Sequence, residues 1–342
     1  MDPAPPSLDV VTVGSAIVDV LAHCDDAVVA SHGLVKGTMV LVDHDRSAAL
    51  YETMPPGIEV SGGSAANTAA GIASLGGGVA FVGKVRDDGL GEIFTHDLRS
   101  TGVVYTTPPG TSGPPTARCL VLVTPDAERT MSTYLGTAGE MSAADVDPAL
   151  VASARITYVE GYLVGLPSAE AALAAAMKAA HAAGRKVALT LSDPAWVTLQ
   201  HDAFKTLLPD VDILLGNETE ALELTGERSA ERALAALTRA WGGSAPPDPP
   251  VVVALTLAAK GAMASDGRDT FSVPAEPVDR VEDTTGAGDL FAAGFLLGLA
   301  RERPLEVCLR LGALAAAEVI SHIGARPQTS LAALAAARGL DL

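Results

Sequence analysis

The sequence predicts an α/β protein in which helices cover both faces of a mainly parallel central sheet and a small β lid stands apart. Two observations predict this fold class. From about residue 156 onward, short apolar strands alternate with Ala-rich helices, which is typical of parallel sheets covered by their own crossovers. Residues 103–137 are instead rich in Thr, Pro and Gly, and they predict paired strands that do not fit that sheet.

The order of elements follows from local patterns. Apolar runs bounded by Gly predict strands, and small or apolar residues at helical spacing predict helices. The first half contains strands at Leu8–Val13, Val79–Val82, Cys119–Val123 and Thr130–Tyr134, edge strands and turns within Asp19–Val42, and a helix within Ser61–Gly78. The second half contains a strand from Ile156, helix 168–183, strand Val187–Leu191, a helix near 202–207, strand Val211–Leu215, helices 218–225 and 229–241, a Pro-rich loop at 245–250, strand Val251–Leu257, a hairpin at 262–273, and helices 287–301, 304–321 and 330–338.

Composition and charge exclude several classes of protein. The chain has 342 residues, of which 48% are hydrophobic and 19% charged, so a sizeable core is expected. Its formal charge is −18, and a diffusely acidic chain repels nucleic acids and anionic membranes. Three scattered cysteines predict neither a disulfide framework nor a zinc site, and the sequence predicts neither a signal peptide nor a membrane span. We therefore expect a cytoplasmic protein with no nucleic-acid or membrane partner and a flexible tail at residues 1–7.

The most informative stretch is Asp283-Thr-Thr-Gly-Ala-Gly-Asp289, which runs directly into an apolar helix. Gly286 and Gly288 allow a tight turn and close approach to a ligand. The first N–H groups of the helix and its dipole form an anion cradle suited to a phosphoryl group in transfer. Asp289 lies beside that cradle, where a carboxylate can accept a proton from a hydroxyl in line with the phosphorus. A Thr-capped helix start with an acidic first turn explains the same residues without any chemistry.

Four motifs in order resemble those of the ribokinase-like, or PfkB, family of carbohydrate and nucleoside kinases. The 283–289 loop is similar to the second family signature, and 62–67 with 75–77 and 81–91 is similar to the first. Residues 211–221 look like the NxxE element, and 251–261 look like the nucleotide-edge loop. The resemblance implies a ribokinase-like three-layer sandwich. It also implies a single kinase domain over residues 8–328, with lid segments at about 19–42 and 103–137.

The resemblance implies a role for each matching residue at the phosphate end of the site. Asp289 is expected to be the catalytic base, and the transferred phosphate is expected to bind the backbone of Gly286, Ala287 and Gly288. Mg²⁺ is expected near Asn217 and Glu220, held through its waters, although a polar helix start explains this pair equally. ATP is expected to contact Thr256, Lys260, Gly261 and Thr285. The family usually has Gly where this chain has Ala258, and a monovalent cation such as K⁺ is expected near Asp283 and the 321–327 loop.

The resemblance also implies where the phosphate acceptor binds. Asp19 follows the first strand, where a carboxylate can accept from two vicinal hydroxyls of a sugar. Gly62, Gly63 and Asn67 are expected to bind the same sugar, and Arg129 resembles a lid arginine that reaches the phosphates. Structural interpretations stay open for three of these residues. Asp19 can be a solvated acid, Asn67 an ordinary polar residue of a helix, and Arg129 a surface charge.

Three segments favour a nucleoside acceptor, because 211–221, 190–196 and 128–134 are similar to the adenosine kinase branch of the family. Tyr162 and Trp196 are expected to contact a purine face, with core packing as the alternative for Trp196. We therefore expect an ATP-dependent kinase of a ribonucleoside, with adenosine as the acceptor and AMP as the product. The alternatives are a sugar kinase acting on ribose, fructose or a keto-deoxy sugar acid, and a nucleoside-binding module without turnover. The protein is expected to be a monomer or a homodimer.

Overall fold

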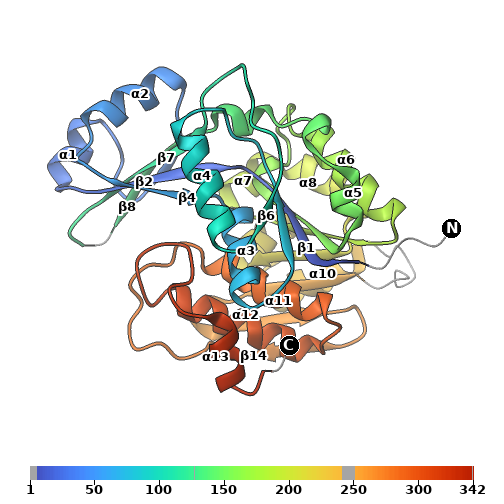
Figure 1. Ribbon diagram of the computed structural model, residues 1–342. Helices are drawn as coiled ribbons and strands as arrows, with labels where there is room; N and C mark the ends of the chain where they lie inside the picture. The colour runs from blue at the N-terminus through green and yellow to red at the C-terminus, as the bar shows by residue number, and fades with distance from the viewer. Residues whose placement is uncertain (1–5, 127, 241–250, 341) are drawn as a thin grey trace.

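A computed structural model describes residues 6–126, 128–240, 251–340 and 342. A large sheet with helices on both faces forms the body, and a smaller sheet with two helices projects from one side of it (Figure 1). The predicted α/β class with a mainly parallel central sheet is confirmed. Residues 1–5 of the predicted tail and the predicted loop at 245–250 lie outside the described residues.

The large sheet has nine strands in the order β14-β13-β12-β11-β10-β9-β1-β5-β6. All neighbours from β12 to β6 are parallel, and β13 and β14 add an antiparallel edge. The strands are β1 Leu8–Val13, β5 Val79–Val82, β6 Val104–Tyr105, β9 Ala154–Val159, β10 Lys186–Thr190, β11 Ile213–Asn217, β12 Val252–Thr256, β13 Ala262–Ser265 and β14 Thr270–Val273. Because the parallel strands run the same way, the residues that follow them meet at one edge of the sheet.

The small sheet has five strands in the order β3-β8-β7-β2-β4. They are β2 Ile17–His23, β3 Met39–Leu41, β4 Ile58–Gly62, β7 Ala117–Val123 and β8 Arg129–Tyr134. Two details differ from the predicted lid segments. The sequence analysis placed Ser61 and Gly62 at the entrance of a helix, but both residues belong to β4. The predicted lid segment 103–137 begins with β6, but β6 pairs in parallel with β5 and so belongs to the large sheet.

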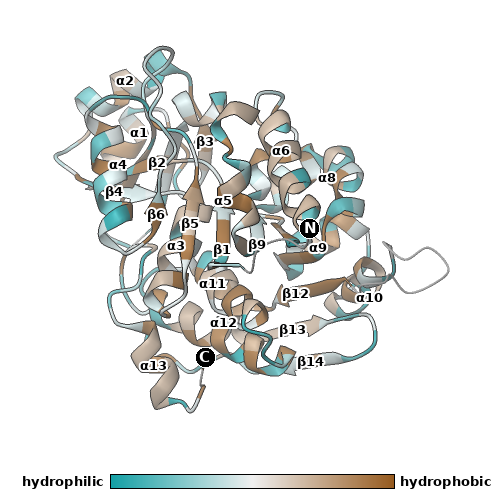
Figure 2. Ribbon diagram, turned by 45° about the vertical axis from the view of Figure 1, so that its right-hand side comes forward, coloured by the Kyte–Doolittle hydropathy of each residue, from teal (hydrophilic) through white to brown (hydrophobic). Residues whose placement is uncertain are grey.

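Helices pack in two layers on the large sheet, and a third group covers the small one. The helices are α1 Asp26–Ser31, α2 His44–Thr53, α3 Ser64–Ser74, α4 Gly89–Ser100, α5 Pro148–Ala152, α6 Glu170–Ala182, α7 Pro194–Leu199, α8 His201–Leu207, α9 Glu218–Thr225, α10 Ala230–Ala240, α11 Ala287–Ala300, α12 Leu305–Val319 and α13 Leu331–Ala337. One buried cluster joins α3, α4, α11, α12 and α13 to the sheet, and a second joins α5 to α10 to the opposite face. The brown hydrophobic segments of Figure 2 run through these layers.

Alternation along β1 explains how one strand serves both layers. Val10 contributes to the first cluster, while Val11 and Val13 contribute to the second, as the period of two in a strand requires. Neighbouring strands repeat the pattern, so the sheet is apolar on both faces and its strands are short continuous apolar runs. The sequence signal was correspondingly strong for these strands.

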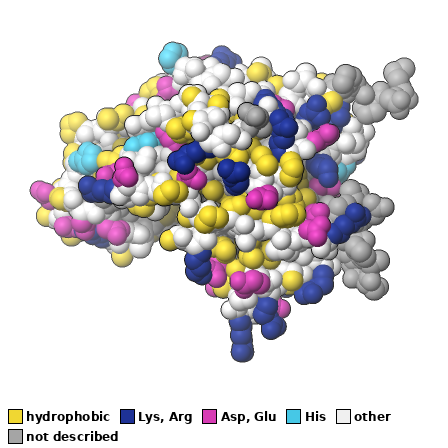
Figure 3. All heavy atoms as spheres, turned by 90° about the horizontal axis from the view of Figure 1, so that it is seen from below, with side chains coloured by type: hydrophobic (Ala, Val, Ile, Leu, Met, Phe, Trp, Pro, Cys, Tyr) yellow, Lys and Arg dark blue, Asp and Glu magenta, His cyan; other side chains and the backbone are white. Residues whose placement is uncertain are grey.

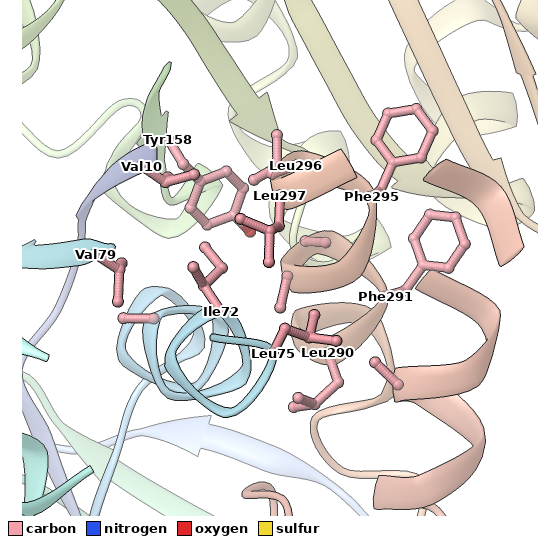
Figure 4. Packing of buried hydrophobic residues seen from close by; sticks show 14 of the residues in the cluster. Val10, Ile72, Leu75, Val79, Tyr158, Leu290, Phe291, Phe295, Leu296 and Leu297 are labelled. Atoms are coloured by element: carbon pink, nitrogen blue, oxygen red, sulfur yellow. The ribbon is translucent and has the colours of Figure 1, made fainter. Parts of the chain in front are cut away.

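The contact between α3 and α11 matters most for function, because sequence-predicted site residues lie in the first turn of each helix, Asn67 in α3 and Asp289 in α11. Figure 4 shows Ile72 of α3 and Leu75, the residue after α3, near Leu290 and Leu297 of α11. Gly71 permits this close approach, since a Cβ on it would come within 2.5 Å of Leu290 Cδ1. The first turns of the two helices are therefore held side by side.

The surface carries charges of both signs. Lys and Arg side chains lie among Asp and Glu side chains on the face seen from below in Figure 3, so the net negative charge does not form a single acidic patch there. Within the described part of the chain, every helix is too short or too polar to cross a lipid bilayer.

Candidate functional site

Asp289, the predicted base, lies half-buried in the first turn of α11 with a donor on each carboxylate oxygen. Ser64 Oγ donates to its Oδ1 at 2.6 Å, and Asn67 Nδ2 donates to its Oδ2 at 3.0 Å. Both donors belong to the first turn of α3, so the helix contact described above sets this geometry. Burial raises the pKa of Asp289, while the hydrogen bonds from Ser64 and Asn67 and the charge of Arg326 oppose that rise. The carboxylate is fixed in orientation and chemically able to accept a proton.

The turn before α11 leaves backbone donors open beside this carboxylate. Gly286 has a φ of 81°, and a Cβ there would lie 2.9 Å from Ala325, so the position requires glycine. The first helical bond runs from Leu290 N–H to Gly286 O at 2.8 Å, which leaves the N–H groups of Gly288 and Asp289 without an intrahelical acceptor. Gly288 is exposed, and no atom from elsewhere in the described chain lies within 4 Å of where its Cβ would be. An anion therefore has both donors and space here.

Asp283 ties this turn to the small sheet and to the loop after α12. Its Oδ1 accepts from Thr285 N–H at 3.0 Å, and its Oδ2 accepts from Gly324 N–H at 2.9 Å. Arg129, at the start of β8, forms an ion pair with the same carboxylate. The Arg129 side chain is 12% exposed, so its interpretation as a surface charge is wrong. The cation predicted near Asp283 and the 321–327 loop stays a prediction, although the two segments do meet.

Asp19 lies on β2 in the small sheet, on the face opposite to the two helices that cover that sheet. A Cβ on Gly62 would lie 2.2 Å from Asp19 Oδ2, so Gly62 makes room for the carboxylate. Gly63, with a φ of 91°, lies where a Cβ would meet Ser15 O at 2.3 Å, and it forms the turn into α3. Gly62 and Gly63 thus bring the Asp19 carboxylate close to the first turn of α3.

The neighbours of Asp19 on this face are mostly apolar. In register, Asp19 lies between Val60 of β4 and Cys119 of β7, and Leu21 lies between Ile58 and Val121. Two further strands continue these rows, with Thr133 and Leu41 beyond Cys119 and with Met131 and Met39 beyond Val121. We call this surface the open face of the small sheet. Ile58 is 70% exposed, Leu41 52% and Met39 41%, so a carboxylate stands within an exposed apolar surface.

Electrostatics couple the two carboxylates. Burial raises the pKa of Asp19 to about 6, which Arg326 and Arg129 oppose and Asp289 reinforces. The charge of Asp289 therefore acts on the Asp19 carboxylate. The interpretation of Asp19 as a solvated loop acid is therefore wrong, because it lies on a strand and its carboxylate is largely desolvated.

Asn67 was expected to bind the acceptor sugar, and in the structure its side chain bonds to two other side chains of the protein. It is 4% exposed, and both ends of its amide are engaged, since Nδ2 donates to Asp289 and Oδ1 accepts from Arg326 Nε at 3.1 Å. Its direct contact with an acceptor sugar stays a prediction. What the described residues show is a link between a cation and the predicted base.

Asn217 and Glu220 form a reciprocal cap at the start of α9. Glu220 N–H donates to Asn217 Oδ1 at 2.9 Å, while the backbone N–H of Asn217 donates to Glu220 Oε2 at 2.8 Å. Glu220 is 5% exposed, and burial raises its pKa to about 7. The described residues hold no cluster of three or more His, Cys, Asp or Glu side chains suited to a metal. The donor set does fit Mg²⁺ held through water, since carboxylate and amide oxygens are the ligands it prefers.

The predicted nucleotide-edge residues follow β12, next to Asn217 in the sheet. Thr256 lies opposite Asn217 in the parallel ladder, and Gly261 has a φ of 101° with Val273 O 2.0 Å from where a Cβ would be. Ala258 has a φ of 50°, a conformation in which glycine is strongly favoured. The family usually has Gly at this position. The chain therefore places Ala in a backbone conformation that suits Gly better. Lys260 forms an exposed ion pair with Glu218 at 3.0 Å.

Tyr162 and Trp196 lie together after strands β9 and β10. Their ring centroids are 6.4 Å apart, and Trp196 Nε1 donates to Gly161 O at 3.1 Å and to Val164 O at 3.2 Å. Trp196 also packs against the second buried cluster, which supports a structural role for it. Its contact with a purine stays a prediction.

Three functional candidates were missed from the sequence. Ser64 contacts Asp289, and Arg326 contacts Asn67, a hydrogen-bond partner of Asp289. Glu160, which follows β9, is 1% exposed, and it accepts hydrogen bonds from Ala65 N–H at 3.1 Å and from Ser15 N–H at 3.3 Å. Burial raises the pKa of Glu160 to about 7. Glu160 had a usable signal, since it is an acid directly after a buried parallel strand. Arg326 had no such signal, because Asn67, its hydrogen-bond partner, lies 259 residues away along the chain.

A comparison with family models gives one match, in which residues 57–331 correspond to the pfkB family carbohydrate kinase model. The chain belongs to this family. Kinases of the family use ATP and typically Mg²⁺. An anion cradle with an acid beside it is consistent with the transfer of a phosphoryl group from ATP. The chain is therefore a kinase of the sugar and nucleoside type, and its ribokinase-like α/β fold agrees with the resemblance inferred from the four motifs.

Individual relatives refine the branch. The adenosine kinase from Sinorhizobium meliloti is 47% identical, with a TM-score of 0.87 over 98% of this chain and 99% of that chain. A probable sugar kinase from Rhizobium etli is 44% identical, with a TM-score of 0.90 over 98% and 100% of the two chains. The adenosine kinase of Schizophyllum commune is 31% identical over 91% of this chain and 94% of its own. The pfkB kinase is thus adenosine kinase-like.

Proposed function

We propose that this chain transfers the γ-phosphoryl group of ATP to the 5′-hydroxyl of a ribonucleoside, with adenosine as the acceptor and AMP as the product. The observation that carries the proposal is the position of Asp289. Its carboxylate is held by two donors, it stands beside the open backbone of Gly288, and its charge acts on Asp19 across the site. A proton acceptor, an anion cradle and a hydroxyl-binding carboxylate are the three parts that this reaction needs.

The proposal gives each residue a role. Asp19 accepts hydrogen bonds from two ribose hydroxyls, which places the 5′-hydroxyl toward α11. Asp289 then takes the proton of that hydroxyl as the new O–P bond forms. The N–H groups of Gly288 and Asp289 and the dipole of α11 stabilise the negative charge on the transferred phosphoryl group. Mg²⁺, when bound, would neutralise charge on the nucleotide phosphates, and Asn217 and Glu220 would hold it through its waters.

The open face of the small sheet supports a nucleoside rather than a bare sugar. A free sugar presents hydroxyls on all sides and has little to gain from Ile58, Leu21 and Met39. A purine is flat and largely apolar, so its contact with those side chains would bury exposed apolar area at about 25 cal/mol per Å². The sugar kinase alternative keeps specific support of its own, because the probable sugar kinase of Rhizobium etli matches over the full length of both chains.

A coupled assay of ADP release tests the proposal across acceptors. Adenosine, ribose, fructose and a keto-deoxy sugar acid are each supplied with Mg-ATP, and the product is identified by its phosphate position. We expect turnover with adenosine and a 5′-monophosphate as product. 5′-Deoxyadenosine serves as a matched control, because it keeps the base and both ribose hydroxyls but has no hydroxyl to phosphorylate. It is expected to bind competitively without turnover.

Each other outcome assigns a different function. Turnover confined to a free sugar would replace the nucleoside kinase with a sugar kinase. Tight adenosine binding without ADP release from any acceptor would indicate a binding module that has lost phosphoryl transfer.

A further inference from the structure

Arg326 is a largely buried cation in the loop between α12 and α13, and it lies among acidic side chains from three separate elements. Its charge acts on Asp19 of β2, Asp97 of α4 and Asp289 of α11. Its Nε donates to Asn67 Oδ1 at 3.1 Å. Its Nη2 is buried without a hydrogen-bond partner among the described residues. A buried guanidinium with so few direct partners is costly, which points to a use beyond stability.

The loop that carries Arg326 is fixed at both ends. Glu318 Oε1 accepts from the N–H groups of Gln328 and Thr329, both at 2.9 Å, and from Thr329 Oγ1 at 3.0 Å. On the other side, Asp283 accepts from Gly324 N–H, and Ala325 lies against Gly286. The guanidinium is therefore held in place before any ligand binds, as positioning of a reactive group requires.

Arg326 determines which end of Asn67 faces Asp289. An amide has a donor end and an acceptor end. Because Arg326 Nε can only donate, it takes the Oδ1 end and leaves Nδ2 to donate to Asp289 Oδ2. With Ser64 on Oδ1, both carboxylate oxygens then have a donor, and the orientation of the carboxylate is set. Loss of Arg326 would leave Asn67 Oδ1 without this donor, and the amide that donates to Asp289 would be held less firmly.

We propose that Arg326 is a positioning residue for phosphoryl transfer, which orients Asp289 through Asn67 and keeps Asp289 an anion. This inference rests on the proposed function, in which Asp289 is the base. Arg326 acts through its neighbours, and the proposal requires no contact between it and either substrate.

The charges around Asp289 explain why a cation is needed there. Asp19, Glu160 and Glu220 all interact with Asp289 as like charges, from β2, the end of β9 and α9. The charge of Asp289 also acts on the nearby Tyr158 and Tyr162, but both stay neutral because burial raises the pKa of each. Arg326 is the one cation found to lower the pKa of Asp289 among the described residues. Without it, the effect of burial would be opposed less strongly, which favours the protonated form of Asp289, and that form cannot act as a base.

The test compares kcat against pH for the wild-type protein, Arg326→Gln and Arg326→Lys at saturating adenosine and Mg-ATP. We expect the acid limb of the Arg326→Gln profile to move to higher pH. At pH values below the limb, kcat should be reduced about tenfold for each pH unit of movement. The rate of Arg326→Gln should approach that of the wild type as the pH rises. Arg326→Lys keeps the charge and should restore the wild-type acid limb in part. Arg280→Gln removes an exposed charge paired with Glu282 and should leave the profile unchanged.

Two results would overturn the inference while leaving the proposed function intact. One is a kcat lowered equally at every pH with no movement of the limb, which is what a purely structural role gives. The other is a raised KM for adenosine with an unchanged profile, which would make Arg326 a substrate-binding group instead.

A readout without activity separates this inference from the proposed function. The ¹³C resonance of the Asp289 carboxyl, assigned by its loss in Asp289→Asn, can be followed against pH in the wild-type protein and in Arg326→Gln. The inference expects the midpoint to rise in the variant, and an unchanged midpoint would contradict it. If the wild-type protein phosphorylates no acceptor, the proposed function fails, but the titration still decides whether Arg326 governs Asp289.

Discussion

The two sides of the candidate site are built in opposite ways. On the α11 side, Leu290, Phe291 and Phe295 are at most 3% exposed, and the first turn of the helix is held by α3 and by the loop of Arg326. On the side of the small sheet, Ile58 is 70% exposed and β3 is exposed at all three of its residues. The α11 side therefore has its geometry without ligand. The open face has apolar surface that only a ligand, or closure over one, can remove from water.

We propose that phosphoryl transfer takes place on the rigid side and that the acceptor is recognised on the open one. Phosphoryl transfer depends on positions fixed to within a fraction of an ångström, which packed helix termini provide. Acceptor binding tolerates, and gains from, a surface that adapts. Changes on the α11 side should therefore act on turnover, and changes on the small sheet should act on acceptor affinity.

The largest effect is expected for Asp289→Asn, which keeps the shape of the side chain and removes the proton acceptor. We expect kcat to fall roughly 10²–10⁴-fold, with the dissociation constant for adenosine nearly unchanged. Single-turnover phosphorylation together with calorimetric titration of adenosine measures both quantities. A variant that kept most of its rate would remove Asp289 from the role of base.

The matched pair Gly286→Ala and Gly288→Ala separates backbone strain from anion binding. At Gly286 a Cβ would meet Ala325 at 2.9 Å in a left-handed conformation, so we expect a loss of stability of about 2 kcal/mol. At Gly288 the Cβ enters open space, and Ala favours the helix by about 0.5–1 kcal/mol. Urea unfolding measures both effects.

The same pair tests the cradle kinetically. If the phosphoryl group occupies the space above Gly288, the folded and slightly more stable Gly288→Ala protein should still lose roughly 10²-fold in kcat/KM for ATP. Full activity in Gly288→Ala would show that the phosphoryl group binds elsewhere.

Asp19→Asn is the corresponding test on the open face. The amide keeps one acceptor oxygen but loses the charge that strengthens two hydrogen bonds to vicinal hydroxyls. We expect KM for adenosine to rise about tenfold to a hundredfold with kcat reduced far less. Initial-rate kinetics with adenosine and with 2′-deoxyadenosine check the assignment. The variant should discriminate less between these two acceptors than the wild type does, and undiminished discrimination would contradict a contact of Asp19 with the 2′-hydroxyl.

The last effect is on stability rather than on turnover or acceptor binding, and it acts through Glu160. Because burial raises its pKa from the ordinary value of 4.5 to about 7, the folded protein binds the proton more tightly than the unfolded chain does. The contribution of Glu160 to the free energy of unfolding is therefore fully present below pH 4.5 and decreases as the pH rises to about 7. The loss is on the order of 3 kcal/mol. Asp19 and Glu220, whose pKa values are also raised, act in the same direction.

Glu160→Gln, which can still accept from Ser15 and Ala65, isolates this contribution. Its free energy of unfolding should depend less on pH between 5 and 8 than that of the wild type, as measured by urea unfolding without Mg²⁺ or nucleotide. An equal slope for both proteins would mean that Glu160 is ionised or solvated in the folded state.

Prediction from sequence succeeded where the signal is local. The strands β1 and β5 are largely apolar runs, and two glycines followed by an acid indicate the turn into α11. Both signals lie within a few residues of the element that they predict. The helices α1 and α2 on the small sheet were not expected. Each is amphipathic only in relation to that sheet, where Val29 and Leu50 are buried against Leu122 and Leu120. Strand β4 was missed because its exposed Ile58 and Val60 give it no buried pattern.

The sequence by itself determined the family, the α/β class and the backbone of the turn at 283–289, because the motifs specify backbone conformations and donors within a few residues. The tertiary structure alone decided what surrounds Asp289. Ser64, Asn67, Arg326 and Glu160 come from distant segments and meet only when α3 packs on α11 and the loop after α12 folds over both. Charge and burial set the protonation of a carboxylate, and neither can be read until the chain has brought these segments together.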